Sequence, residues 1–144
     1  VLTLRTFSKV YGLAGLRIGF GVGNEDLIAD LRRTQAPFSA TAVAQAGAIE
    51  ALKHQDRVKE RVSANAEGRD FLFAALVERG VAPAESQANY VYFVPARPSR
   101  EIADALMAKG VIVRRLGVGL RVTVGTPSEN ARFVEALDEV LAAS

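Results

Sequence analysis

Short apolar stretches of strand length alternate along this chain with longer stretches in which apolar residues recur at helical spacing. This alternation is typical of an α/β fold and disfavours an all-helical or an all-strand fold. The expected strands are residues 1–6, 17–22, 89–94, 111–114 and 120–124. Five helices are expected between and after them: from Asn24 to a break at Pro37, from Ser39 or Thr41 to about His54, from about 55 to 79, from Ser99 to about Lys109, and from 127 onward.

Residues that favour helix ends support these boundaries. Asn24 can cap the first helix because acidic residues follow it, and Ser39 or Thr41 can cap the second. Ser99 is the expected N-cap of the fourth helix. Gly80 is the expected C-cap of the third, since glycine tolerates the left-handed conformation there. The expected apolar face of the third helix carries Val58, Val62, Phe71, Leu72 and Leu76, and the last helix is expected to turn Phe133, Leu137, Val140 and Leu141 inward.

Composition excludes several classes of protein. The chain has 144 residues, 49% of them hydrophobic, which is enough for a core, but no apolar run approaches the roughly 18 residues of a membrane span. Cysteine is absent, which excludes disulfides and fits a reducing compartment such as the cytoplasm. The net charge is +2 and the charges are interspersed, so neither nucleic acid nor a membrane is an expected partner. Since the chain starts with valine inside an expected strand, we expect it to be the C-terminal part of a longer enzyme.

The segment between the first two expected strands carries the clearest chemistry. It reads TFSKVYGLAGLRIGFG over residues 6–21. Lys9 alone would most often be a solvated surface residue. In this setting, however, a strand end is expected to deliver the lysine into a glycine-lined pocket, where its amine is suited to bond an aldehyde. The hydroxyls of Thr6 and Ser8 and the guanidinium of Arg17 are suited to hold a phosphate. Pyridoxal 5'-phosphate (PLP) carries both groups.

The same segment resembles the cofactor-lysine motif of the class I/II aminotransferases of PLP fold type I. The nearest form, that of the histidinol-phosphate aminotransferase family, reads S-K-[AV]-[YF]-G-L-A-G-L-R-[IV]-G-[YF]. The resemblance implies that Lys9 bonds the cofactor and then moves a proton at the substrate Cα. It also implies that Thr6, Ser8 and Arg17 form part of the phosphate cup. The glycines serve turns and close packing, and Tyr11 is expected to pack.

A second arginine lies in the segment GLRVTVGT over residues 119–126, which is followed by PSEN. On periodicity alone Arg121 would be a strand arginine that faces solvent. The segment resembles the family's L-R-[IV]-[ST]-[IV]-G-T-x-x-E-N, in which the arginine grips the substrate α-carboxylate. An arginine inside an apolar strand is costly unless an anion pairs with it, which agrees with that role.

Two further positions follow from the resemblance. Arg114 ends the segment GVIVR, similar to the family's G-[VI]-[IV]-V-R, where the arginine is associated with the distal end of the substrate. Asn89 matches the family's A-N-[FY] signature, with a role in substrate contact or domain packing. Arg115 replaces a common proline, and the short stretch from Arg114 to Arg121 is closer to the aromatic branch of the family.

The resemblance also implies the organisation of the protein. Residues 1–54 would end the large PLP-binding domain, residues 55–80 would form a linking helix, and residues 81–144 would form a small α/β domain. The full enzyme would be a cytoplasmic homodimer that transfers an amino group from histidinol phosphate or an aromatic amino acid to 2-oxoglutarate. Because the family's other cofactor-binding residues lie upstream of the lysine, the chain alone is expected to be inactive.

Other functions are possible on this pattern. Threonine-phosphate decarboxylase shares the scaffold and the lysine motif, and a transcription regulator can use an aminotransferase-like domain to sense PLP. A hydrolase triad is excluded, because His54 is the only histidine and is expected to be exposed. No metal site is expected, since no cluster of possible ligands accompanies His54.

Overall fold

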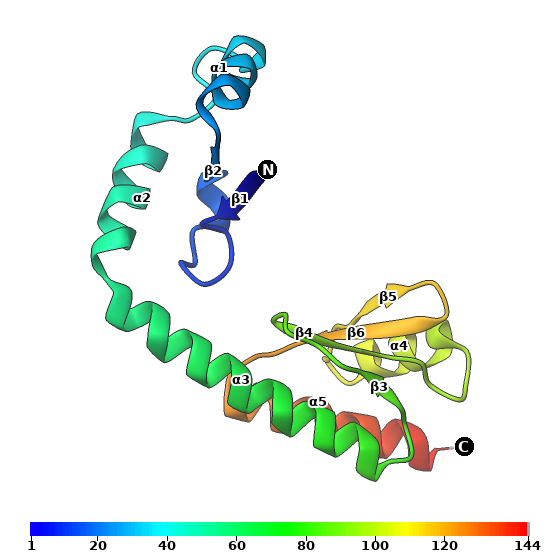
Figure 1. Cartoon of the computed structure of the whole chain (residues 1–144). Coiled ribbons are helices and arrows are strands. Elements are labelled where there is room, and N and C mark those ends of the chain that lie inside the picture. Colours follow the sequence, from blue (N-terminus) through cyan, green and yellow to red (C-terminus); the bar gives the residue numbers. More distant parts are fainter. Residues whose placement is uncertain (144) are drawn as a thin grey trace. The chain divides into compact units, whose positions relative to one another are not determined.

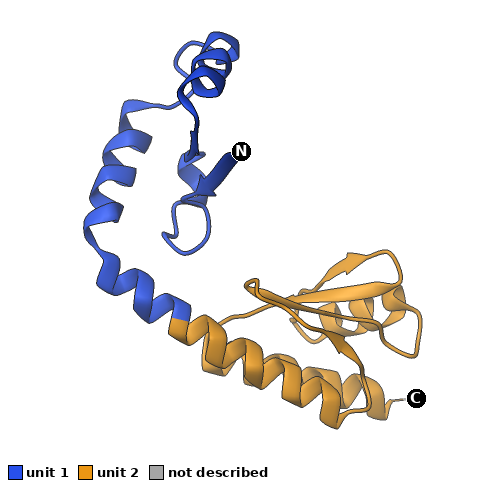
Figure 2. Cartoon of the chain, viewed as in Figure 1, with its two compact units in different colours: residues 1–62 blue, residues 63–144 orange. Residues whose placement is uncertain are grey.

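The structure is a computed structural model that describes residues 1–143. It divides into two compact units, residues 1–62 and residues 63–144, coloured separately in Figure 2. Strands and helices alternate along the chain, so the predicted α/β class is confirmed. No helix in residues 1–143 is both long and apolar enough to cross a membrane. The predicted division at residues 54 and 80 stays a prediction.

The first unit contains a strand pair followed by helices (Figure 1). Its elements are β1 (Leu2–Thr6), the 3₁₀ turn η1 (Ala14–Leu16), β2 (Gly19–Gly23), α1 (Glu25–Thr34), α2 (Ala42–Lys53) and the first part of α3 (Gln55–Glu78). β1 and β2 are antiparallel, and the last pair in their register is Thr6 with Gly19. The loop that joins them is the segment that carries Lys9.

The second strand begins later than the sequence pattern predicted. It was expected over 17–22, but Arg17 has a φ of 51° and ends η1, and pairing starts only at Gly19. A side chain at Gly19 would bring its Cβ to 2.6 Å from the Arg5 carbonyl oxygen, so the close pairing requires glycine. The 3₁₀ turn was not predicted; it forms because Leu16 N–H bonds the carbonyl of Leu13.

Side-chain caps begin the first two helices as expected. The Asn24 carboxamide accepts a hydrogen bond from Leu27 N–H at 3.0 Å, which confirms the predicted cap of α1. Of the two candidates for α2, Thr41 is the cap, since its hydroxyl accepts from Ala44 N–H at 3.1 Å. These bonds satisfy backbone donors that the first helical turn leaves free.

The second unit is a four-stranded antiparallel sheet with three helical segments. It comprises the second part of α3, then β3 (Pro83–Ala84), β4 (Tyr90–Phe93), α4 (Ser99–Ala108), β5 (Arg114–Leu116), β6 (Gly119–Thr123) and α5 (Pro127–Ala142). The strand order is β3-β4-β6-β5, and β3 was not predicted. One face of the sheet and the helices bury a continuous core that includes Leu72, Leu76, Val91, Phe93, Ile102, Leu106, Leu120, Val122, Phe133, Ala136, Leu137 and Val140.

Helix α3 ends as predicted, but its apolar face is shorter than expected. Gly80 has a φ of 70°, and Val81 N–H bonds the Leu76 carbonyl, which confirms the glycine cap. Leu72 and Leu76 are buried, whereas Val62 and Phe71, expected on the same face, are 57% and 47% exposed. Of the apolar face expected for this helix, only residues in its second part are therefore buried in a core.

Two expectations around α4 were wrong. Ser99 is the first residue of the helix and not its cap; its hydroxyl donates to the Gly117 carbonyl oxygen at 3.0 Å, and Pro98 occupies the cap position. The strand expected over 111–114 begins only at Arg114. Val111 cannot join it because its N–H bonds back to the Leu106 carbonyl and closes the helix.

Candidate active site

The loop between β1 and β2 is closed at its base by backbone hydrogen bonds. Phe7 N–H donates to the Ile18 carbonyl at 3.2 Å, and Leu13 N–H donates to the Phe7 carbonyl at 2.9 Å. Inside the loop, Gly12 N–H donates to the Lys9 carbonyl at 2.8 Å. Gly12 has a φ of 72°, a conformation that favours glycine, so Lys9 opens a tight turn that the sequence specifies.

Aromatic packing anchors this turn. Phe7 is 3% exposed, and its ring lies 4.8 Å from the ring of Tyr11 and 5.8 Å from that of Phe20. The packing role expected for Tyr11 is confirmed. Phe7 directly precedes Ser8, so a buried side chain fixes the start of the segment from which the candidate residues project.

Lys9 is exposed, and its amine has no hydrogen-bond or ion-pair partner among residues 1–143. Ser8 is half-buried, and its N–H donates to the Thr6 hydroxyl oxygen at 3.0 Å. Arg17 donates from Nη1 to the Ala14 carbonyl at 2.7 Å and forms no ion pair with a described residue. The glycine-lined enclosure expected around the lysine is not formed by the described residues, because Lys9 lies open.

The donor set of this loop fits a phosphate-bearing aldehyde such as PLP. Lys9 leaves its amine free, Arg17 leaves most of its guanidinium donors free, and Thr6 and Ser8 add hydroxyls. No Asp or Glu occurs between residues 6 and 17, so no carboxylate of the loop competes for these donors. The loop brings all four predicted cofactor residues into one short segment.

In the second unit, the predicted substrate arginines lie side by side on one face of the sheet. Arg121 of β6 pairs in register with Arg114 of β5 on one side and with Tyr92 of β4 on the other. Directly opposite residues share a face, so the three form a row on the face away from the core. Neither arginine forms an ion pair with a described residue, which leaves two cationic groups without a carboxylate.

Arg121 is held by stacking and not by hydrogen bonds. Its guanidinium carbon lies 4.8 Å from the centroid of the Tyr90 ring, a cation–π distance. Its Nε is buried without a hydrogen-bond partner among the described residues. Leaving such a donor unpaired costs about 1–3 kcal/mol, so the group suits an anion that arrives from outside the chain. Arg121 is half-buried and lies on the face away from the core, opposite the buried side chains of Leu120 and Val122, as its periodicity predicted.

The turn beyond Arg121 is fixed by the residues that follow it. The Thr126 hydroxyl and the Glu129 carboxylate form a capping box at the start of α5, and these hydrogen bonds hold the pKa of Glu129 below its usual range. The Asn130 side chain bonds both the N–H and the carbonyl of Gly125, at 2.9 and 3.2 Å. Glu129 and Asn130 of the family motif therefore brace the end of the strand that carries Arg121.

Asn89 and Arg115 are placed by the same sheet. The Asn89 carbonyl accepts from Val124 N–H at 3.0 Å, and its half-buried side chain has no hydrogen-bond partner among the described residues. Arg115 lies within β5 opposite Leu120. The short connection after it is a two-residue hairpin loop in which Gly117 has a φ of 58°. Proline is not needed to form this turn.

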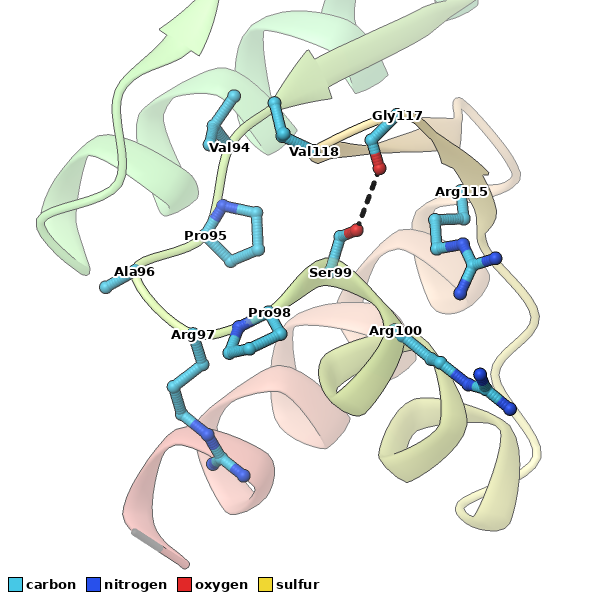
Figure 3. A pocket seen from close by; sticks show the side chains of 10 residues that line it. All are labelled: Val94, Pro95, Ala96, Arg97, Pro98, Ser99, Arg100, Arg115, Gly117 and Val118. Atoms are coloured by element: carbon cyan, nitrogen blue, oxygen red, sulfur yellow. Dashed lines mark hydrogen bonds between the residues drawn. The ribbon is translucent and has the colours of Figure 1, made fainter.

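A separate cavity of the second unit lies beside the start of α4 (Figure 3). Its lining includes Arg97, Arg100 and Arg115, and also Ser99 and Gly117, which are hydrogen-bonded to each other. The guanidinium groups of Arg97 and Arg100 extend away from one another in this view. The cavity contains none of the predicted site residues.

The remaining residues to place are His54, for which an exposed position was predicted, and Arg61 and Tyr90, to which the sequence assigned no role. His54 is exposed as predicted, with its ring Nε2 3.2 Å from a Glu50 carboxylate oxygen. Within residues 1–143, no group of three or more metal-ligating side chains gathers. Arg61, which bonds the lysine loop from α3, was not identified from the sequence, since 51 positions separate it from its partner. Tyr90 was quoted only as part of a signature, without a role.

Comparison with known proteins agrees with this arrangement. Residues 1–137 match the family described as aminotransferase class I and II. The chain belongs to this family. A histidinol-phosphate aminotransferase of Moorella thermoacetica is 42% identical over 147 aligned positions, covering 99% of this chain and 38% of that protein. An aromatic amino acid aminotransferase of Rhodococcus erythropolis is 40% identical, covering 96% of this chain and 39% of its own length.

The fold comparison leads to the same family. The crystal structure of histidinol-phosphate aminotransferase from Sinorhizobium meliloti in complex with pyridoxal-5'-phosphate matches with a TM-score of 0.89 and 30% identity, over 99% of this chain and 41% of that one. The predicted resemblance and fold class are confirmed. The chain spans about two fifths of the length of these relatives.

Proposed function

We propose that a protein containing this chain transfers an amino group from histidinol phosphate or an aromatic amino acid to 2-oxoglutarate, forming the oxo product and glutamate. The observation that carries the proposal is the Lys9 amine, which has no hydrogen-bond or ion-pair partner among residues 1–143, in a segment that also carries Arg17 and the hydroxyls of Thr6 and Ser8. The names of the relatives support both kinds of donor.

The cofactor of this proposal is PLP, which supplies an electron sink that makes the Cα–H bond of the amino donor acidic. Lys9 would bond the cofactor aldehyde, and its freed amine would be the base that removes the proton from the donor Cα. Arg17, Ser8 and Thr6 hold the phosphate through charged and neutral hydrogen bonds.

Arg121 has the substrate-binding role in this proposal. Its free guanidinium donors orient the α-carboxylate of 2-oxoglutarate, and the Tyr90 ring keeps the guanidinium plane in place. Arg114, opposite it in the sheet, contacts the distal part of the donor, and Asn89 contacts substrate or supports the strand. These assignments explain why two arginines share one face without a carboxylate partner.

The remaining expectations are part of the same proposal. The active enzyme is a cytoplasmic homodimer, and the 144-residue chain does not transaminate by itself, since it spans about two fifths of its relatives. Measurable turnover by the isolated chain with PLP would contradict that last point. The names of the relatives do not favour the decarboxylase or the PLP-sensing regulator, and we propose neither.

The test uses the full-length protein that contains this sequence, loaded with PLP. Histidinol phosphate and phenylalanine are added separately, without any keto acid, and the absorbance of the lysine-linked cofactor is followed. Rapid loss of that absorbance with one donor identifies the donor. If neither donor consumes the lysine-linked form, amino transfer from these substrates is refuted.

A further inference from the structure

One side chain ties the lysine loop to helix α3. Arg61 lies in the first part of α3, and its Nη1 donates a hydrogen bond to the Val10 carbonyl oxygen at 2.8 Å. Val10 directly follows Lys9. Among the described residues, no other side chain from outside segment 6–18 forms a hydrogen bond with that segment. The position of the turn therefore depends on Arg61 as well as on its own backbone bonds.

The guanidinium of Arg61 also lies over the glycine that closes the turn. A Cβ built on Gly12 would lie 3.3 Å from Arg61 Nη1, closer than an ordinary van der Waals contact. Gly12 itself bonds the Lys9 carbonyl and has a φ of 72°. The guanidinium thus bonds the carbonyl that follows the lysine and occupies the space that a side chain at position 12 would need.

No ion pair explains why Arg61 is there. Arg61 forms no salt bridge with a described residue, although the residue that precedes it, Glu60, is acidic. Glu60 pairs instead with Arg57 at 3.0 Å. The bond to Val10 is therefore the one polar contact of the Arg61 side chain within residues 1–143. The remaining donors of the guanidinium are free.

We propose that Arg61 is a positioning residue for Lys9: it holds the Val10 carbonyl and so fixes the turn from which the lysine side chain projects. This rests on the proposed function, in which Lys9 bonds the cofactor aldehyde. A misplacement of about 1 Å can cost a reaction roughly a hundredfold, so the backbone next to a reacting lysine must be held.

The experiment compares Arg61→Ala and Arg61→Lys with Arg57→Ala in the full-length protein. Arg57 is a matched control, because it is an exposed arginine one turn earlier on the same helix, and its side chain bonds only Glu60 among the described residues. Two quantities are measured: the dissociation constant of PLP together with the absorbance of the lysine-linked form, and hydrogen–deuterium exchange of residues 9–13 in the cofactor-free protein.

Arg61→Ala should weaken PLP binding by about tenfold, the size expected for losing a hydrogen bond from a charged donor. It should also accelerate amide exchange at Gly12, whose N–H closes the turn. Arg61→Lys should recover part of both effects, since an ammonium can still donate to the carbonyl. Arg57→Ala should behave as wild type.

Wild-type PLP affinity and unchanged exchange in Arg61→Ala would overturn the inference. So would faster exchange spread evenly over the protein, because that would mark a general loss of stability. If the wild-type protein forms no lysine-linked cofactor, the proposed function fails. The exchange measured without PLP would then still decide whether Arg61 holds the turn.

Discussion

The two units of this chain differ in how much of their structure they support themselves. Within residues 1–62, the buried apolar side chains are Phe7, Ala44 and Ala48, while Leu4 and Phe20 are 71% and 44% exposed. The second unit buries a continuous core drawn from three helices and two strands. Hydrophobic burial is the main stabilising force in folding, so the second unit has most of the stability.

The first unit, which buries fewer apolar side chains, carries the amine of Lys9. Lys9 and Arg17 lie on a loop anchored by one buried ring and a few hydrogen bonds, whereas Arg121 projects from a strand whose opposite face is buried. The residues proposed for catalysis are therefore largely distinct from the residues that stabilise the fold. Substitutions in the loop should change catalysis with little change in stability, and core substitutions in the second unit should do the reverse.

The largest effect is expected at Lys9. Lys9→Ala should lower amino transfer by about a hundredfold to ten-thousandfold, the range that a positioned general acid–base group contributes. The free energy of unfolding should stay within about 0.5 kcal/mol of wild type, since the side chain is exposed and unpaired. Turnover and urea unfolding are measured on the full-length protein. Lys59→Ala, another exposed lysine without a partner, is the control and should change neither.

The next effect concerns the core. Phe93 is 1% exposed and packs against Phe133 with ring centroids 6.3 Å apart. Phe93→Ala should destabilise the protein by about 3–5 kcal/mol. Phe20→Ala, in the first unit, should cost clearly less, because nearly half of that side chain is already exposed. An equal loss of the free energy of unfolding in both variants, measured by urea unfolding, would contradict the difference in stability between the units.

A smaller effect is expected at the Tyr90 ring. Tyr90→Leu removes the cation–π partner of Arg121, and it should raise the KM for 2-oxoglutarate by roughly 3- to 10-fold with little change in kcat. Tyr90→Phe keeps the ring and should behave as wild type. A Tyr90→Leu enzyme with normal KM would show that stacking does not position Arg121.

The smallest effect is a pH dependence of stability in the second unit. Arg79 donates two hydrogen bonds to Asp138, at 2.5 and 2.6 Å, and they hold the pKa of Asp138 below its usual range. The pair therefore stabilises the fold above about pH 4, the usual range of an unfolded aspartate, and this part is lost as the pH falls through the lowered pKa.

Because Asp138 is half-exposed, the pair should contribute only about 0.5 kcal/mol at neutral pH. Asp138→Asn should lower the urea midpoint at pH 7, and its difference from wild type should be smaller at pH 3. Asp104→Asn, which breaks a single contact of 3.7 Å with Arg100, is the control with a smaller expected change. An equal loss for Asp138→Asn at both pH values would contradict the electrostatic explanation.

The sequence predicted best what local chemistry decides. Asn24 and Gly80 mark helix ends through hydrogen bonds within a few residues, and both were identified correctly. The segment around Lys9 identified the family, because a long run of consecutive positions matches its motif. In the last helix, Phe133, Leu137 and Val140 are buried as their spacing predicted, and Leu141, expected with them, is half-buried.

What the sequence missed depends on contacts between distant residues. Ser99 was assigned as a cap, but its hydroxyl is used by Gly117, 18 positions later. Val111 was assigned to a strand, yet its N–H completes the preceding helix. Arg61 carries no local signal that relates it to Val10. The exposure of Lys9 likewise could not be read from neighbours in the sequence, which suggested an enclosed site.

The central claim is that Lys9 is the lysine that bonds the cofactor. The most direct test is to reduce the PLP-loaded full-length protein with borohydride, digest it and locate the pyridoxyl group by mass spectrometry. The pyridoxyl group is expected on the peptide containing Lys9, and not on the peptides containing Lys53, Lys59 or Lys109. A pyridoxyl group on another lysine, or on none, would contradict it.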